Sequence, residues 1–238
     1  MANNAKHPQI NLLLTRPMAA SHTFWEALNS ETRQLLQPIV SPLIKINPIT
    51  SGLEISGSVI FSSVNGALNG PAGDGRIAYC VGAMTTQAAL TAGWAAIQAG
   101  ETANQLVLNL LNRKVGVSLT HLSGVHTRGN IAEILSAGGV STKRIVVYDQ
   151  EVCALTSQAT EALSVNFPLL VPLFSPRTAR SFADQNNGQA ALHIIALSQD
   201  VADQVSDLTL ETLTVLDHPT RLAMIDETQK VASDLTLG

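Results

Sequence analysis

The chain has 238 residues, of which 45% are hydrophobic and only 13% are charged. This composition excludes a disordered chain and provides enough apolar residues for a sizeable buried core. The formal net charge is −4 and the 14 Lys and Arg residues are scattered, which excludes a nucleic-acid-binding protein that relies on a basic stripe.

A short apolar run, a small polar or glycine turn and a helical pattern recur along the chain. In chain order, the apolar runs predict strands at 10–14, 58–61, 77–81, 115–119, 145–148, 169–174, 193–197 and 213–216. The helical patterns lie at 21–36, 84–99, 128–137, 158–163, 177–183, 200–206 and 220–232. Strands that alternate with helices in this way favour parallel sheets covered on both faces and joined by right-handed crossovers.

Two extended segments interrupt this alternation. Pro38 and Pro42 flank residues 39–46, and two prolines this close disfavour a helix and suit an edge strand or a linker. The strand at 145–148 continues in extended form toward Val152. Both segments are candidates for chain crossings between two parts of the protein.

Two pairs of blocks in the sequence resemble each other. Residues 59–67 and 172–179 both contain an apolar strand, a Phe, one or two Ser and a helix, and 78–88 and 194–202 follow them in the same order. Strand–turn–helix patterns are common, so each pair alone says little, but the shared order and spacing predict two related lobes.

The expected fold is therefore α/β, with two similar lobes that are each a parallel sheet flanked by helices, joined by a two-stranded linker. Lobe 1 would comprise residues 1–38 and 153–238, and lobe 2 residues 47–144. The linker strands would be 39–46 and 145–152, and we expect a ligand cleft between the lobes.

The residues that follow the predicted strands are candidates for ligand binding. Ligands of open parallel sheets bind beyond the carboxyl ends of the strands, where helix N-termini offer unpaired N–H groups to anions. Small residues let a ligand approach this backbone, although Ser and Thr at such positions also serve as ordinary helix N-caps. The cations nearest to these turns are Arg16, Arg128 and Arg177.

Other chemistries find no support in the sequence. It contains no phosphate-binding loop, no G-x-G-x-x-G after a strand and no G-x-S-x-G elbow. His121 and His126 are spaced poorly for a shared metal, so no metal site is predicted. Tyr148 ends a predicted strand and could donate a proton or a hydrogen bond; it could equally be an amphipathic side chain at a domain seam.

The strand-end motifs, taken in order, resemble those of the uroporphyrinogen-III synthase family over nearly the whole chain. Each motif alone is weak, but their common order is specific. The matching segments are 13–17 (LLTRP), 60–67 (IFSSVNGA), 81–85 (VGAMT), 124–130 (GVHTRGN), 146–148 (VVY), 173–179 (LFSPRTA) and 195–198 (IALS).

This resemblance implies a lyase that closes hydroxymethylbilane, a linear tetrapyrrole with eight carboxylates, into uroporphyrinogen III in haem biosynthesis. Loss of water would give an azafulvene, and the last ring would be inverted through a spiro intermediate. No cofactor or metal is implied, and Tyr148 would assist departure of the hydroxyl group. The candidate substrate-binding residues, from the turns and the motifs together, are Arg16, Ser63, Asn65, Gly82, Thr85, Gly124, Arg128, Ser175, Arg177 and Ser198.

One departure from the family pattern leaves an alternative open. Residues 198–202 read SQDVA where the family often has Gly-Pro-Thr-Thr-Ala, and Asp200 adds a negative charge beside a supposed carboxylate site. A non-catalytic two-lobed protein that binds an anionic metabolite would have the same features. An unrelated nucleotide-dependent enzyme is disfavoured because phosphate loops are missing.

The N-terminal segment and the cysteines bear on where the protein works. Residues 1–10 are polar and no apolar run reaches the roughly 18 residues of a membrane span, so neither a signal peptide nor a transmembrane helix is predicted. Cys80 and Cys153 lie far apart, outside any C-x-x-C pair, which is typical of structural thiols in a reducing compartment. We expect a cytoplasmic monomer that could receive its substrate directly from hydroxymethylbilane synthase.

Overall fold

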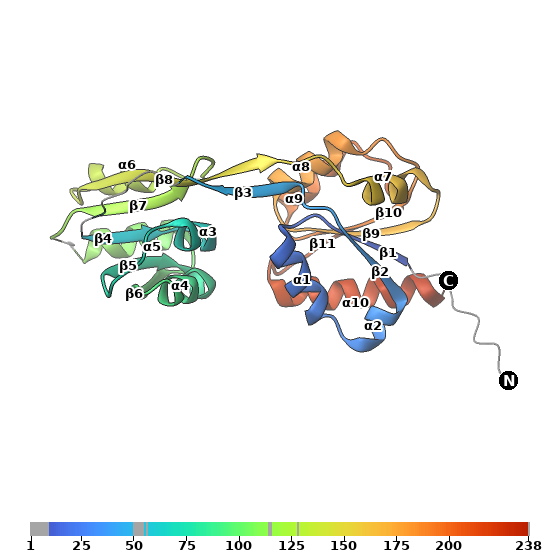
Figure 1. Cartoon of the computed structure of the whole chain (residues 1–238), viewed down its shortest axis with the longest axis horizontal. Coiled ribbons are helices and arrows are strands. Elements are labelled where there is room, and N and C mark those ends of the chain that lie inside the picture. The colour runs from blue at the N-terminus through green and yellow to red at the C-terminus, as the bar shows by residue number, and fades with distance from the viewer. Residues whose placement is uncertain (1–9, 50–54, 56, 114–115, 128, 238) are drawn as a thin grey trace. The chain divides into compact units, whose positions relative to one another are not determined.

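The computed structural model describes residues 10–49, 55, 57–113, 116–127 and 129–237. The chain divides into two compact units (Figure 1). Unit 1 contains the residues up to Lys45 and those from Val152 onward, and unit 2 runs from Ile46 to Glu151. Each unit is described below by itself.

Unit 1 is built on a five-stranded sheet in which every pairing is parallel. Helices α1, α2 and α10 lie with one face of the sheet, whose core includes Phe24 and Met224, and α7, α8 and α9 cover the other, with Phe182. The strand order is β11 (Thr212–Val215), β10 (Ala191–Ala196), β9 (Pro168–Leu173), β1 (Ile10–Leu14) and β2 (Leu36–Val40). The helices are α1 (Met18–Ala27), α2 (Ser30–Leu35), α7 (Ser157–Ser164), α8 (Pro176–Gln185), α9 (Gln199–Ala202), a 3-10 turn (Asp203–Val205) and α10 (Arg221–Leu237).

Unit 2 contains a sheet of six strands. Helices α3 and α4 pack on one face, in a core with Phe61 and Trp94, and α5 and α6 pack on the other, in a core with Leu106 and Leu135. The strand order is β3 (Ile44–Pro48), β8 (Thr142–Val152), β7 (Leu119–Gly124), β4 (Ser58–Phe61), β5 (Ile77–Val81) and β6 (Ala95–Gly100). The helices are α3 (Val64–Asn69), α4 (Gly82–Thr91), α5 (Ala103–Asn112) and α6 (Ile131–Ala137).

Five strands of each sheet follow the same spatial order with a different starting point in the chain. The series β2-β1-β9-β10-β11 of unit 1 matches β8-β7-β4-β5-β6 of unit 2. The first two strands of the unit 1 series come from the start of the chain, whereas their unit 2 counterparts come from the end of that unit. The two units are therefore circular permutations of one strand arrangement.

The structure corrects several element predictions. The strand expected at 115–119 is β7, which runs from Leu119 to Gly124, and helix α5 was not predicted. The helix expected at 21–36 is two helices, because Asn29 caps α2 by accepting the Thr32 N–H at 2.8 Å. The helix expected at 84–99 ends at Thr91, because Gly93 adopts φ +82 and the chain turns into strand β6. Ile39 and Val40, expected in a linker strand, belong to β2 at the edge of the unit 1 sheet, where Pro38 is tolerated.

Candidate functional site

In each unit, the helices that follow two neighbouring strands leave to opposite faces of the sheet. In unit 1 these strands are β1 and β9, and in unit 2 they are β7 and β4. Such a topological switch point opens a crevice beyond the carboxyl ends of the strands, where ligands of α/β proteins bind. The residues just after these four strands therefore define the candidate sites.

The unit 2 switch point contains a hydrogen-bonded pair, Ser63 and Tyr148. Ser63 is the N-cap of α3, and its hydroxyl accepts the Gly66 N–H at 3.1 Å. The same hydroxyl lies 3.1 Å from the phenol oxygen of Tyr148, a residue of β8 that is only 4% exposed. Because Ser63 Oγ already accepts one bond, it can donate its own hydrogen to Tyr148, which leaves the phenol hydrogen available for a ligand.

Gly124 makes room for the Tyr148 ring. A Cβ atom added at Gly124 would lie 2.5 Å from the Tyr148 ring, so the ring rests directly on the glycine backbone. The pairing of β7 with β8 slips between Ser123 and Gly124, which leaves Val147 as an extra residue in β8. This bulge turns Tyr148 to the face of the sheet on which α3 begins.

The opposite face of β7 contains a second hydrogen-bonded pair. Ser62 Oγ lies 2.9 Å from Nε2 of His121, whose side chain is almost completely buried. Burial lowers the pKa of His121 to about 4, and the nearby charge of Arg144 acts in the same direction while Glu133 partly opposes it. The imidazole is therefore neutral at physiological pH, and it positions Ser62 without adding charge.

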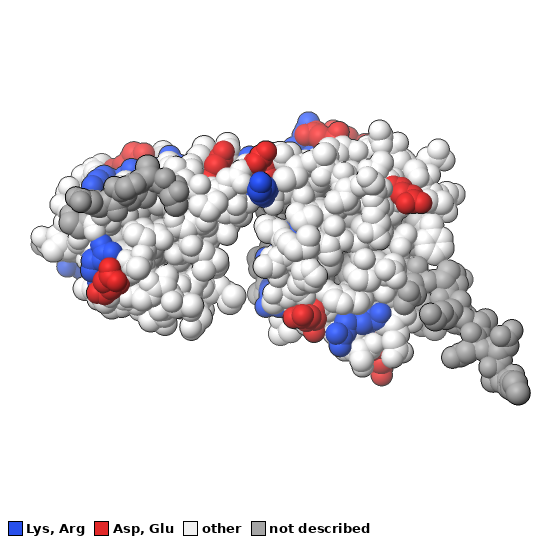
Figure 2. All heavy atoms as spheres, viewed as in Figure 1, with Lys and Arg blue, Asp and Glu red and all other residues white. Residues whose placement is uncertain are grey.

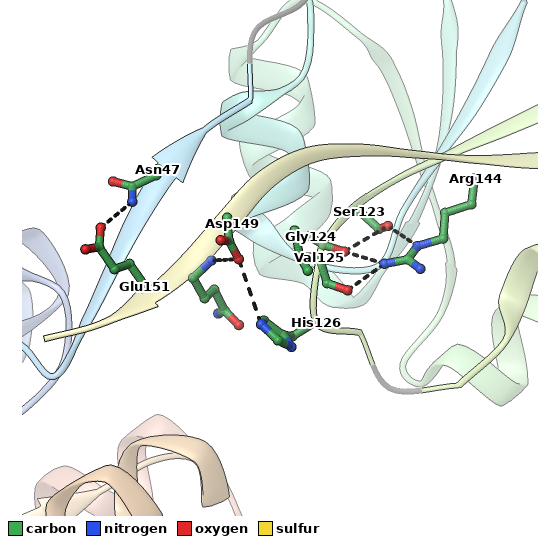
Figure 3. Close-up of polar contacts among 9 residues, drawn as sticks. Asn47, Ser123, Gly124, Val125, His126, Arg144, Asp149 and Glu151 are labelled. Atoms are coloured by element: carbon green, nitrogen blue, oxygen red, sulfur yellow. Dashed lines mark hydrogen bonds and ion pairs between the residues drawn. The ribbon is translucent and has the colours of Figure 1, made fainter.

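Arg144 forms hydrogen bonds with the segment Ser123–Val125 at the end of β7. Its guanidinium donates to Ser123 Oγ at 2.9 Å, to the Gly124 carbonyl at 2.6 Å and to the Val125 carbonyl at 2.8 Å (Figure 3). Further along β8, Asp149 lies 3.9 Å from Nε2 of His126, an exposed contact that contributes little.

The unit 1 switch point contains a cation on an aromatic ring. Arg16 follows β1, and its guanidinium carbon lies 4.2 Å from the centre of the Phe174 ring. The pKa of Arg16 is lowered, first by burial and second by the nearby charge of Arg221. Among the described residues, neither arginine has a carboxylate partner, and the buried Thr15 hydroxyl has no hydrogen-bond partner. Two neighbouring cations without a carboxylate partner favour an anionic ligand.

Ser175, which follows β9 at the unit 1 switch point, is the N-cap of α8. Its hydroxyl accepts the Thr178 N–H at 3.2 Å and contacts the Thr178 hydroxyl at 2.9 Å. These bonds are local to the helix, so Ser175 is an ordinary cap on the contacts that the structure shows, and its backbone remains the part that could meet a ligand.

The structure places the predicted site residues in three groups. Ser63, Gly124 and Tyr148 meet at the unit 2 switch point, and Arg16 and Ser175 lie beside that of unit 1. Asn65 lies in the first turn of α3. Gly82, with φ +73, and the buried Thr85 lie at the start of α4. Ser198 precedes the short α9, and its side chain forms no cap bond. Arg128 lies outside the described residues.

Arg177 lines a separate groove of unit 1 with a volume of about 670 Å³. Residues 152–154, the α8 residues Arg180 and Asp184, and Gln204 share its walls. Arg180 and Asp184 form an ion pair at 2.9 Å within this groove. The sequence grouped Arg177 with Arg16, but α8 places it on the groove side of the helix.

Three polar residues of the unit 2 site were missed by the sequence argument. Ser62, His121 and Arg144 come together only because β4, β7 and β8 are neighbours. The sequence pattern suggests only a metal-ligand role for His121 and argues against it. Its position two residues before Ser123 in one strand was the available signal, since it puts both side chains on one face.

Two kinds of feature are absent from the described part of the chain. It contains no group of three or more His, Cys, Asp or Glu side chains that could hold a metal ion. None of its helices is long and apolar enough to cross a membrane. On the face shown in Figure 2, charged side chains are thinly spread over a mostly uncharged surface.

These features define a class: an α/β protein of two permuted units, each with polar or cationic groups at its switch point. A profile of the family described as "Uroporphyrinogen-III synthase HemD" matches residues 27–226. The chain therefore belongs to the uroporphyrinogen-III synthase family. This membership supports the cyclase interpretation over the non-catalytic alternative.

The solved structures that resemble this chain include uroporphyrinogen-III synthases. The enzyme from Helicobacter pylori 26695 shares 14% identity with a TM-score of 0.65, and the match covers 94% of this chain and 100% of the other. This likeness concerns the fold. A mutant uroporphyrinogen III synthase from Thermus thermophilus has 11% identity and a TM-score of 0.48, over 95% of this chain and 99% of the other. No curated protein sequence matches the chain.

Proposed function

We propose that this chain is an active uroporphyrinogen-III synthase, a lyase that converts hydroxymethylbilane into uroporphyrinogen III. The observation that carries the proposal is the Ser63–Tyr148 pair, 3.1 Å apart at the unit 2 switch point and seated on Gly124. Family membership supplies the reaction, and this pair supplies a hydrogen-bond donor at a position where ligands of such sheets bind.

Tyr148 is the proposed group that assists departure of the hydroxyl. Loss of water breaks a C–O bond at the hydroxymethyl end and removes a pyrrole N–H proton, which gives the azafulvene. With Ser63 donating to its oxygen, the Tyr148 phenol can direct its hydrogen to the leaving hydroxyl and stabilise the charge that develops there. Its ring is buried against Gly124, so this donor keeps a fixed direction.

The remaining work is positioning of a reactive, many-times-negative substrate. Arg16 is the proposed partner of one substrate carboxylate, because its charge is partly buried beside Arg221 and has no carboxylate partner among the described side chains. The backbone N–H groups that begin α4 and α8 are candidates for further carboxylates. Holding the two ends of the linear tetrapyrrole in one reactive geometry is the main contribution that such a site can make to the rate.

A coupled assay tests this function. Porphobilinogen and its deaminase supply hydroxymethylbilane, and the protein is added to the mixture. We expect the type III isomer; formation of only the spontaneous type I isomer would refute catalysis and favour a binding protein. The cytoplasmic location and the substrate handover from hydroxymethylbilane synthase stay predictions.

A further inference from the structure

The direction in which the Tyr148 side chain points depends on a short segment of β7 and the turn after it, Ser123–Val125. This segment contacts Tyr148 through its backbone. The ring lies on Gly124, and the Val125 N–H donates to the Tyr148 carbonyl at 3.0 Å. Tyr148 faces Ser63 only because the β7–β8 register slips between Ser123 and Gly124. Without the extra residue, Tyr148 would lie on the same face as Arg144 and Val146, away from Ser63.

Arg144 forms hydrogen bonds with this segment at the point where the strand register shifts. Its guanidinium bonds the Ser123 hydroxyl and the Gly124 and Val125 carbonyls, the last two at 2.6 and 2.8 Å (Figure 3). A bulge disrupts the regular ladder, and the planar guanidinium provides several donors in a fixed arrangement for the carbonyls beside it. Lys143, one residue earlier, has the same charge. Among the described residues, the side-chain bonds to the Ser123–Val125 segment come from Arg144 and not from Lys143.

We propose that Arg144 is a positioning residue for the synthase reaction: it fixes the Ser123–Val125 segment, and this segment fixes the ring of Tyr148 against Ser63. Arg144 does not touch Tyr148, and it acts from the opposite face of the sheet. This inference rests on the proposed function for its kinetic consequence, but its structural part concerns the free protein.

The kinetic test is a double-mutant cycle with a matched control. Arg144→Gln is expected to lower kcat about tenfold with KM within about twofold, because a slightly misplaced group costs rate more than affinity. Lys143→Gln, which removes the same charge one residue away, should keep the original kcat. In a Tyr148→Phe background, Arg144→Gln should lower kcat by less than about twofold, since the group it positions is already gone.

The structural test uses fluorotyrosine-labelled protein and needs no activity. The chain has two tyrosines, Tyr79 and Tyr148, so the ¹⁹F spectrum has one internal reference. Arg144→Gln should shift and broaden the Tyr148 signal and leave the Tyr79 signal in place, whereas Lys143→Gln should change neither. The Tyr148→Phe variant assigns the two signals.

Two results would overturn the inference: an unchanged Tyr148 signal in Arg144→Gln, or an equal loss of kcat with and without the Tyr148 phenol. If Arg144→Gln does not fold, Arg144→Lys, which keeps the charge but loses the forked donors, takes its place in both tests. Should the chain lack synthase activity, the ¹⁹F result still decides whether Arg144 positions the ring, so the two failures are distinguishable.

Discussion

The two switch points have the same backbone conformation at the helix cap but different side-chain contacts. Ser63 has φ −153 and ψ 154, and Ser175 has φ −150 and ψ 147. Each caps the helix after its strand by accepting an N–H from the residue three positions on, at 3.1 and 3.2 Å. Among the described contacts of these two caps, only Ser63 reaches a residue of another strand, the phenol of Tyr148 on β8.

The residue before each cap shows the same divergence. Matching the caps aligns Ser62 with Phe174, one position away from the alignment that the letters Phe-Ser suggest. Ser62 bonds the neutral His121, whereas Phe174 supports the guanidinium of Arg16. The strand-to-helix turn thus has the same form in both units. The unit 2 turn is surrounded by hydrogen-bonding side chains, whereas the unit 1 turn lies beside a cation. The repeat predicts where a ligand binds but not which chemistry meets it.

Breaking the seat of Tyr148 should have the largest effect. Gly124→Ala puts a Cβ atom 2.5 Å from the ring, so the ring must shift from the position in which its hydroxyl contacts Ser63. We expect at least the kcat loss of Tyr148→Phe and, from overpacking, about 1–3 kcal/mol of lost stability. Urea unfolding and the coupled assay measure both. The control is Gly116→Ala, where an added Cβ meets nothing within 4 Å. Equal kcat and equal stability of the two variants would contradict the conclusion that the Tyr148 ring rests on Gly124.

Removing the phenol hydroxyl tests the donor itself. Tyr148→Phe should lower kcat about 100-fold, the usual range for losing a positioned proton or hydrogen-bond donor. The midpoint of thermal unfolding should change little, because the ring remains packed. An unchanged rate would remove Tyr148 from the mechanism.

Stability should depend on pH through His121 in unit 2. Its pKa is about 4 in the folded protein against about 6.5 when unfolded, so the unfolded chain binds the extra proton and stability falls as the pH drops through this window. The expected loss is about 2 kcal/mol between roughly pH 7 and pH 4.5. His121→Gln should flatten most of this dependence and leave the share of His193, whose pKa is also lowered by burial. The control Gly116→Ala, which changes no titratable group, should keep the full slope, measured by urea unfolding at each pH.

The cation of unit 1 should act on substrate binding more than on the chemical step. Arg16→Gln is expected to raise KM about tenfold, as for the loss of one charge-assisted bond, with a smaller change in kcat. Arg16→Lys should keep part of the affinity. A variant with unchanged KM would exclude Arg16 from carboxylate binding.

The paired caps give the smallest and most direct comparison. Ser63→Ala and Ser175→Ala should each cost about 1 kcal/mol of stability, because each loses one N-cap bond. Only Ser63→Ala should also slow turnover, since only Ser63 contacts Tyr148. Equal loss of activity in both variants would mean that the two switch points work alike.

The sequence predicted most of the α/β alternation and the positions of Ser63 and Gly124 at the ends of strands, because these follow from local patterns. Tyr148 was also expected to end a strand, but it lies within β8, which continues to Val152. It could not predict the Ser62–His121 bond, which joins residues 59 positions apart, since that needs β7 beside β4. The bulge that aims Tyr148 leaves no mark in the apolar alternation of β8. Strand β6 was read as helix because its Ala-rich stretch has no strand character of its own and depends on pairing with β5.

The place where the chain leaves and re-enters unit 1 has a consequence for folding. The N–H of Cys153 donates to the carbonyl of Leu43 at 2.9 Å, so the whole of unit 2 is inserted between two adjacent backbone positions. Once unit 2 has folded, it links the early and late strands of unit 1 as a tight hairpin would. The entropy of bringing β1 beside β9 is then that of closing a short loop, not one of more than a hundred residues.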